Sequence, residues 1–584
     1  MNPRPPGPTA ACARVVLLAL LSMLVLPPAA GTSGPRAPGA ARAQWALQQA
    51  ASAVQQGDFA GAARLLEPAM PAMAADARAW RLLGLIRLKL HLSAQAIEAY
   101  RKSLALQADN AQAMYYLGVA EAQRGDVERA FAWLQKARAS RQYDMTQIQV
   151  DKDLESLRAD ARFAELLPTA RDFEHPFVEN VGVVREWDGE AAGDQFGWIA
   201  RVIGDADGDG FNDFVTSAPT KNIGGDNAGR VYVYSGRNGA LLWRADGAPG
   251  DQLGTGLEAA GDTDGDGVPD VIASAPEIDT AYVYSGRDGR VLLTLRGEAK
   301  GDHFGQHVAS AGDIDGDGGA DLIIGAPNSA ARGKDSGRAY VYSGKDGRRL
   351  LTLTGERAGD QFGSTVAGYA DGKHRFLLVG APTAGPHKTG RVYVYRGLTT
   401  KPAFVIDADA TGVALGYMFV SVLGDVDGDG VPDIFASDWS NAARGPGTGR
   451  VYVHSGRTGR RIYRFTGETA GEGFGTTHST AGDVDGDGRA DLIVGAWQYS
   501  GAAQSGGRAY LYEGRTGALL RTYTCRTPGD TFGFDAVGMG EVDERGQALL
   551  LITSGWSAVH GNHSGRVFLI SSGVPRHQGG RSPP

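Results

Sequence analysis

The chain has 584 residues, enough for two or more domains, and carries a mild net charge of -8. Its 85 glycines are about twice the usual share, yet they follow no three-residue period, which excludes a collagen-like fibre. Because the charge is mild and the acidic residues are concentrated in short patches, nothing indicates a nucleic-acid partner.

The N-terminus has the pattern of an export signal. Arg4 and Arg14 precede a mostly apolar run of twelve residues, 15–26. This run is shorter than the ~20 residues that cross a bilayer and is typical of a signal-peptide core. We therefore predict a signal peptide in residues 1–30, cleaved somewhere in 30–43. An uncleaved membrane anchor is the alternative.

The number of cysteines and the apolar stretches indicate whether the chain without its signal peptide has disulfides or membrane spans. Removal of the signal leaves Cys525 as the one cysteine, so no internal disulfide is expected. No later apolar stretch is long enough for a membrane span. We expect an exported protein that is periplasmic, secreted or associated with the cell surface.

Residues 43–144 repeat with a period of 34 residues. One position holds a small residue in each unit and the position four later holds a large one: Ala62, Ala96 and Ala130, then Leu66, Tyr100 and Leu134. A small residue lets two helices approach closely, and the large residue fills the space between neighbouring pairs. The pattern resembles the tetratricopeptide repeat family. The resemblance implies about three helical repeats whose stack leaves a concave face for peptides or partners.

Residues 145–175 are expected to form a capping helix and a linker. The stretch from Ile148 to Leu167 is apolar at helical spacing, and His175 and Pro176 mark the domain boundary.

A second repeat begins after residue 180. A Phe-Gly or Leu-Gly pair recurs at intervals of 51 to 59 residues, starting at Phe196, Leu253, Phe304, Phe362, Leu415, Phe474 and Phe532. Each unit continues with an apolar stretch, in most units an acidic patch, a strand such as "DLIIGAP", an alternating segment such as "GRAYVYSG", a turn and a last strand. Seven units of four short antiparallel strands predict a seven-bladed β-propeller over residues 180–573. A disordered tail is expected at 574–584.

The last unit indicates how the ring closes. It stops after its third strand, at Ser572, while a spare strand, "VVREW" at residues 183–187, precedes the first Phe-Gly pair. We predict that this strand completes the seventh blade and leaves no open edge there.

The "FG…GAP" units with an acidic loop resemble the FG-GAP repeats of the integrin α-chain propeller. The GAP element is literal at residues 325–327 and 380–382, and the resemblance covers about residues 180–573. The expected fold is thus multidomain, with α-helical tetratricopeptide-like repeats followed by an all-β seven-bladed propeller.

The acidic patches share the pattern D-x-D-G-D-G-x-x-D in five units. Positions 1, 3 and 5 place three carboxylates on one side of a tight loop, position 7 offers its backbone carbonyl, and position 9 adds a fourth carboxylate. Hard oxygen ligands at this density suit calcium better than magnesium or zinc. This agrees with the calcium loops that the integrin resemblance implies. The alternative is a solvated Asp-Gly turn.

The predicted ligands follow these positions. The carboxylates are Asp205, Asp207, Asp209 and Asp213; Asp262, Asp264, Asp266 and Asp270; Asp313, Asp315, Asp317 and Asp321; Asp425, Asp427, Asp429 and Asp433; and Asp483, Asp485, Asp487 and Asp491. The carbonyls are those of Phe211, Val268, Gly319, Val431 and Arg489. Units four and seven read "YADGKHRF" and "EVDERGQA" and lack the pattern. We therefore expect about five Ca²⁺ ions with a structural role.

A search for catalytic motifs indicates a binding protein. The chain has no G-x-S-x-G, H-E-x-x-H or G-x-x-x-x-G-K motif. We predict an exported, calcium-binding, non-enzymatic interaction or adhesion/scaffold protein with an unidentified protein or glycan ligand. The alternative is a carbohydrate- or lipid-directed exported enzyme whose propeller holds the active site, which a cluster of basic side chains facing the central channel would favour.

Aromatic residues mark one candidate ligand patch. They follow the second strand in units five to seven: Trp439, Trp497, Tyr499 and Trp556. Exposed aromatics on one side of a propeller would bind protein or sugar. The alternative is that each tryptophan packs against a neighbouring blade.

Overall fold

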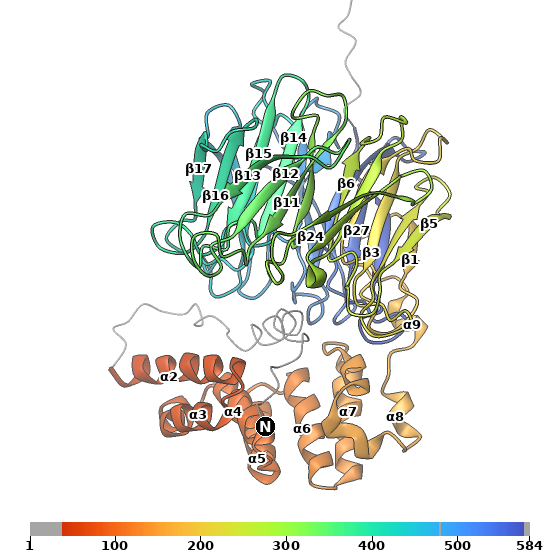
Figure 1. The fold of residues 1–584 in the computed structure, drawn as a ribbon. Coiled ribbons are helices and arrows are strands. Elements are labelled where there is room, and N and C mark those ends of the chain that lie inside the picture. The colour runs from red at the N-terminus through yellow and green to blue at the C-terminus, as the bar shows by residue number, and fades with distance from the viewer. Residues whose placement is uncertain (1–37, 478–479, 577–584) are drawn as a thin grey trace, which may run out of the picture. The chain divides into compact units, whose positions relative to one another are not determined.

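The structure is a computed structural model that describes residues 38–477 and 480–576 (Figure 1). The chain divides into two compact units, one ending at Glu174 and the other beginning at His175. The predicted signal peptide and residues 577–584 of the predicted tail lie outside the described residues.

The first unit is a series of antiparallel helix pairs. The helices are α2 (Pro38–Gln55), α3 (Phe59–Leu66), α4 (Ala77–Lys89), α5 (Ser93–Leu106), α6 (Ala111–Gln123) and α7 (Val127–Ser140), with a 3-10 helix, η1 (Glu67–Met73), after α3. Short polar side chains start four of them by accepting a backbone N–H of the first turn: Asp58, Asp76, Asn110 and Asp126. The helical repeat that the 34-residue period predicted is confirmed.

The repeated glycines explain how closely the paired helices pack. A Cβ on Gly84 would lie 2.7 Å from the ring of Tyr100, and one on Gly118 would lie 2.8 Å from Leu134. Both large partners are fully buried. A side chain at either glycine would therefore push α4 from α5 or α6 from α7.

The segment after α7 differs from the single capping helix that we expected. It forms four short turns, η2 (Met145–Gln149), η3 (Lys152–Leu157), α8 (Arg162–Glu165) and α9 (Ala170–Phe173). Asp144, Asp151 and Asp160 each accept a backbone N–H two residues later, so each starts a new turn and interrupts a continuous helix.

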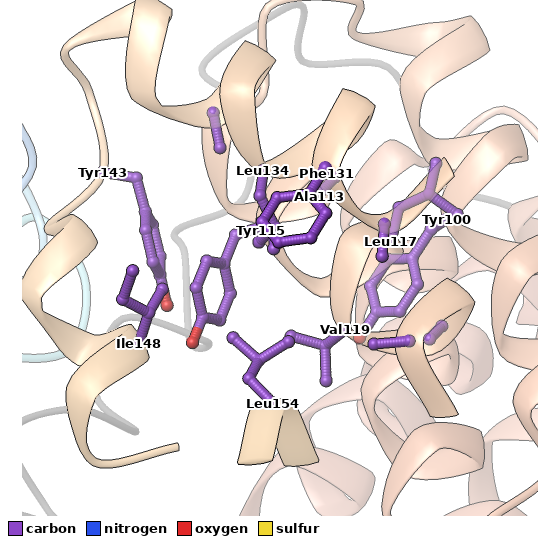
Figure 2. Packing of buried hydrophobic residues seen from close by; sticks show 14 of the residues in the cluster. Tyr100, Ala113, Tyr115, Leu117, Val119, Phe131, Leu134, Tyr143, Ile148 and Leu154 are labelled. Carbon is purple, nitrogen blue, oxygen red and sulfur yellow. The ribbon is translucent and has the colours of Figure 1, made fainter. Parts of the chain in front are cut away.

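The same segment packs on the helical core next to α6 and α7 (Figure 2). Ile148 and Leu154 are fully buried against residues of α6 and α7. The ring of Tyr115 stacks on that of Tyr143 at 4.4 Å, and its hydroxyl donates to Asp151 at 2.8 Å. Apolar burial and polar contacts, among them the Tyr115–Asp151 hydrogen bond, therefore hold the segment in place.

The second unit is built from seven four-stranded antiparallel sheets, the blades of a propeller. Blades one and two are β2 (Ala200–Gly204), β3 (Asp213–Ala218), β4 (Arg230–Tyr234), β5 (Leu241–Asp246), and β6 (Gly256–Gly261), β7 (Asp270–Ala275), β8 (Thr280–Tyr284), β9 (Val291–Arg296), with η4 (Pro276–Ile278) between β7 and β8. Blades three and four are β10 (Val308–Gly312), β11 (Asp321–Ala326), β12 (Arg338–Tyr342), β13 (Arg349–Thr354), and β14 (Thr365–Ala370), β15 (Arg375–Ala381), β16 (Arg391–Arg396), β17 (Phe404–Asp407).

The remaining blades follow the same order. Blades five and six are β18 (Val420–Val422), β19 (Ile434–Asp438), β20 (Arg450–His454), β21 (Arg461–Thr466), and β22 (Thr480–Gly482), β23 (Asp491–Ala496), β24 (Arg508–Tyr512), β25 (Leu519–Thr524). Blade seven contains β26 (Ala536–Val542), β27 (Ala548–Ser554) and β28 (Arg566–Ser571), and its fourth strand is β1 (Val183–Asp188). The first strand of each blade lies nearest the centre, since β2 contacts both β6 and β26.

The ring closes as the sequence predicted. β1 pairs antiparallel with β28, with Trp187 opposite Val567 and Asp188 opposite Arg566. Arg566 forms ion pairs with Asp188 at 2.9 Å and Glu186 at 2.7 Å. The fourth strand of blade seven thus comes from the start of the propeller.

The repeated Phe-Gly pair and the glycine before the third strand connect consecutive blades. The first residue of each pair is at most 1% exposed. Phe362 of blade four forms a parallel bridge with Gly337 of blade three, whose φ is +81°. A Cβ on Gly337 would lie 2.0 Å from the Phe362 carbonyl oxygen, so only glycine fits at this contact.

Candidate metal centres

The five acidic loops occupy equivalent positions in blades one, two, three, five and six. Each loop joins the first strand of its blade to the second, as residues 205–212 join β2 to β3. The Phe-Gly pair precedes the first strand, so it lies at the opposite end of that strand from the loop. All five loops therefore open on one face of the propeller.

Backbone hydrogen bonds fold each loop around its first carboxylate. In blade one, Asp205 accepts N–H groups from Gly208 at 2.7 Å and from Gly210 at 2.8 Å. Both glycines have φ of +80°, which side chains disfavour. Asp207 accepts the N–H of Asp209 at 3.0 Å. The glycines of the pattern are thus required for the turn that gathers the carboxylates.

The ninth-position aspartate is buried and joins the loop to the rest of the blade. Asp213 is fully buried and accepts the N–H of Ala206 at 2.8 Å and that of Gly236 at 3.0 Å. The same bond from the glycine after the third strand recurs in the other four loops, at Asp270, Asp321, Asp433 and Asp491. Burial raises the pKa of four of these carboxyls to about 6: Asp213, Asp321, Asp433 and Asp491.

The carboxylates of positions 1, 3 and 9 converge in all five loops. In each loop, one oxygen from each of the three residues lies within 4.8 Å of the others. A group of carboxylate oxygens, one of them on a buried side chain, fits the all-oxygen coordination of a hard divalent cation. The structure thus brings together three of the four predicted carboxylates in every loop.

The fifth-position carboxylate is held differently. In blade one, Asp209 accepts the N–H of Phe211 at 2.9 Å, and its second oxygen lies 3.2 Å from Nε of Arg237. The residues predicted to offer a carbonyl at position 7 all donate their N–H to the fifth carboxylate in this way. Sequence reasoning missed the arginine partner, although a basic residue follows the "SG" or "EG" pair in all five units.

A second missed contact crosses between blades. The side chain of Arg489, which we expected to contribute only a backbone carbonyl in blade six, reaches Asp425 of blade five at 3.2 Å.

Blades four and seven have ordinary turns in place of the acidic loop. Asp371 of blade four accepts N–H groups from Lys373 at 2.9 Å and His374 at 2.7 Å. Asp543 of blade seven accepts the N–H of Arg545 at 2.8 Å. In each case one aspartate closes a short turn through its own neighbours.

The aromatic residues proposed as a ligand patch are largely packed against one another. Trp497 is 2% exposed and Trp556 is 6% exposed, and their rings meet edge to face at 4.7 Å. The ring centroids of Trp439 and Trp497 are 6.3 Å apart, and the guanidinium carbon of Arg508 lies 3.8 Å from the ring centroid of Tyr499. For the three tryptophans this favours the alternative that each packs against a neighbouring blade.

One buried basic side chain lies among the innermost strands. Arg201 on β2 is 4% exposed and forms ion pairs with Glu258 on β6, at 2.9 Å, and with Asp535 before β26. Its charge is therefore used to connect blades one, two and seven, which is a structural role.

Comparison with known families matches both units. The FG-GAP-like repeat model matches residues 425–494, the FG-GAP repeat model matches 196–234 and 304–342, and the tetratricopeptide repeat model matches 84–144. No helix in the described part of the chain combines the length and the apolar character that crossing a bilayer requires.

Relatives of the chain include integrin α subunits. It is 30% identical to integrin alpha-5 of Xenopus laevis over 219 residues, which is 34% of this chain and 21% of that relative. It is 35% identical to human integrin alpha-IIb over 161 residues, 24% of this chain and 15% of the relative. It is 30% identical to chicken (Gallus gallus) integrin alpha-V over 198 residues, which is 30% of this chain and 19% of that relative. The matches span about a fifth of these relatives or less.

Proposed function

We propose that this chain, an integrin α-like FG-GAP repeat β-propeller with an N-terminal tetratricopeptide repeat region, is an exported, calcium-binding, non-enzymatic adhesion or scaffold protein. The observation that carries the proposal is the convergence of three carboxylate oxygens within 4.8 Å in each of five equivalent loops. Calcium is the cation that such flexible, carboxylate-rich loops suit best.

The calcium is proposed to be structural. Positions 1, 3, 5 and 9 of each loop would provide carboxylates and position 7 a carbonyl. A bound divalent ion supplies two positive charges that offset the repulsion among these carboxylates. Because each loop joins the two inner strands of its blade and its ninth residue is hydrogen-bonded to the turn after the third strand, an ion there would stabilise three strands together.

The interaction role rests on the architecture. Stacked helical repeats expose an extended face suited to peptides, and a propeller exposes two broad faces built from loops. The similarity of the propeller to integrin α subunits supports adhesion or another protein–protein interaction as its use. A protein or glycan is the proposed ligand.

The first experiment is thermal melting of the purified exported chain in EDTA and during a calcium titration, with the bound ions counted by calorimetry. We expect about five ions and a propeller transition that rises with calcium. A melting temperature that does not change with calcium, together with no bound ions, would reject the metal role.

Export is tested separately. Mass spectrometry of the chain from the extracytoplasmic fraction should find a new N-terminus within residues 30–43. Recovery of the full-length chain in the cytoplasm alone would reject export.

A further inference from the structure

A basic residue follows the glycine that comes after the third strand in every blade with an acidic loop. These residues are Arg237, Arg287, Lys345, Arg457 and Arg515. The equivalent positions in blades four and seven, which lack the acidic loop, hold Leu398 and Gly573. Within this chain, blades that have the acidic pattern also have the basic residue, and blades that lack the pattern lack it.

Each basic side chain contacts the fifth residue of its loop. Four arginines pair with the carboxylate: Arg237 with Asp209 at 3.2 Å, Arg287 with Asp266 at 3.1 Å, Arg457 with Asp429 at 3.0 Å and Arg515 with Asp487 at 3.1 Å. In blade three, Lys345 donates to the carbonyl of Asp317 at 3.3 Å, just as Arg237 donates to the carbonyl of Asp209. The contact is thus made in five loops of five.

The backbone places this side chain reproducibly. The glycine directly before it donates its N–H to the buried ninth carboxylate, as Gly286 does to Asp270 at 3.0 Å. The turn that carries Arg287 is therefore attached to the loop that carries Asp266. This attachment explains why the same pair recurs although the two residues are 21 positions apart.

Further arginines reach some loops but not others. In blade two, Arg290 pairs with Asp264 at 2.8 Å, so two carboxylates of that loop have arginine partners. In blade three, Arg348 pairs with Asp315 at 3.1 Å. Blade five receives Arg489 from the next blade. The five loops therefore differ in the number of positive charges that face them.

We propose that these basic residues are counter-cations built into the metal loops, which hold the fifth carboxylate in the absence of metal and compete with a bound ion for it. The inference rests on the proposed calcium function and adds a determinant of affinity. A metal-free loop with four carboxylates is tolerated because the arginine offsets part of its charge. Loops with more arginines bind calcium more weakly, so blade two has a lower affinity than blade one.

The size of the effect follows from electrostatics. A single positive charge about 6 Å from a divalent ion, in a water-like dielectric, changes the binding constant by about tenfold. Salt reduces the effect, because these arginines are about half exposed. Replacing both arginines of blade two is expected to tighten its site by more than replacing either one.

Blade two offers a local optical probe. The indole of Trp243 donates to the Gly286 carbonyl at 2.7 Å, and Gly286 donates to Asp270 of the loop. Terbium, a luminescent substitute for calcium, is sensitised by a tryptophan this close to its site. Luminescence excited through tryptophan and lost in Trp243→Phe reports on blade two, and calcium displaces the terbium. Calorimetric titration with calcium alone gives a second measure of the same affinity.

The test compares Arg287→Gln and the Arg287→Gln/Arg290→Gln double variant with two controls in the full chain. Arg287→Lys keeps the charge, and Arg296→Gln removes an arginine at the other end of the same blade, where it donates to Thr280. We expect about tenfold tighter binding in Arg287→Gln, tighter still in the double variant, and wild-type affinity in both controls. Unchanged or weaker binding in the glutamine variants would overturn the inference while leaving the calcium function intact. Absence of terbium and calcium binding in the wild-type chain would instead overturn the proposed function.

Discussion

Replacing the third-position aspartates by asparagine should stabilise the propeller without metal and destabilise it in the presence of calcium. In each loop, oxygens of positions 1, 3 and 9 lie within 4.8 Å of one another. Two unit charges at that separation repel by about 0.9 kcal/mol in water. Asp207→Asn removes the charge from two of the three pairs, and its amide oxygen still accepts the N–H of Asp209. Without metal the variant should gain stability, by about 2 kcal/mol before screening by salt.

In calcium the wild type should be more stable than the variants. With a dissociation constant of ~0.1 mM, a site gains about 1.4 kcal/mol at ~1 mM calcium, and the five sites together gain about 7 kcal/mol. The quintuple variant that carries asparagine at the third position of every loop should lose most of this gain. The substituted residues are Asp207, Asp264, Asp315, Asp427 and Asp485.

The assay is thermal melting followed by tryptophan fluorescence, in EDTA and at ~1 mM free calcium. Asp371→Asn in blade four is the matched control, because that turn lacks the acidic pattern, and its response to calcium should equal that of the wild type. If the quintuple variant responds to calcium as the wild type does, or loses equal stability in both conditions, the loops stabilise the blades through hydrogen bonds and the reasoning fails.

Three further predictions concern the scaffold. Deletion of residues 183–188 should leave the edge of β28 unpaired and cause self-association, measured by light scattering; a monodisperse monomer would contradict the closure mechanism. Gly84→Ala should destabilise the helical unit by about 1–3 kcal/mol in circular dichroism melts, despite the better helix propensity of alanine, because its Cβ would meet Tyr100. Burial raises the pKa of the Cys525 thiol, so it should react with a thiol reagent only after unfolding; fast reaction of the native chain would show that blade six opens locally.

The sequence predicts the architecture well because both units are periodic. A 34-residue spacing of small and large residues is sufficient to predict the paired helices, and the unpaired "VVREW" segment is sufficient to predict closure of the ring. The cap after α7 could not be predicted as four turns from its apolar spacing alone. There, aspartate side chains compete with the helix for backbone N–H groups, and that competition depends on local geometry.

The candidate sites could be predicted only in part. The acidic pattern lies within nine residues, so it indicates which carboxylates gather. The arginines that face it come from segments 21 to 33 residues away or, for Arg489, from the next blade, and only the fold brings them together. Likewise, the burial of Trp497 and Trp556 depends on contact between adjacent blades, which the sequence of one unit does not specify.

Closure by β1 also has a consequence for how the protein is made. Asp188 and its partner Arg566 are 378 positions apart, so the strand that leaves the ribosome before any other part of the propeller is among the last to find its partner. Until blade seven has been synthesised, Val183, Val184 and Trp187 have no sheet to join. A nascent or prematurely terminated chain therefore displays an unpaired apolar strand, a feature that chaperones and proteases can distinguish from the finished ring.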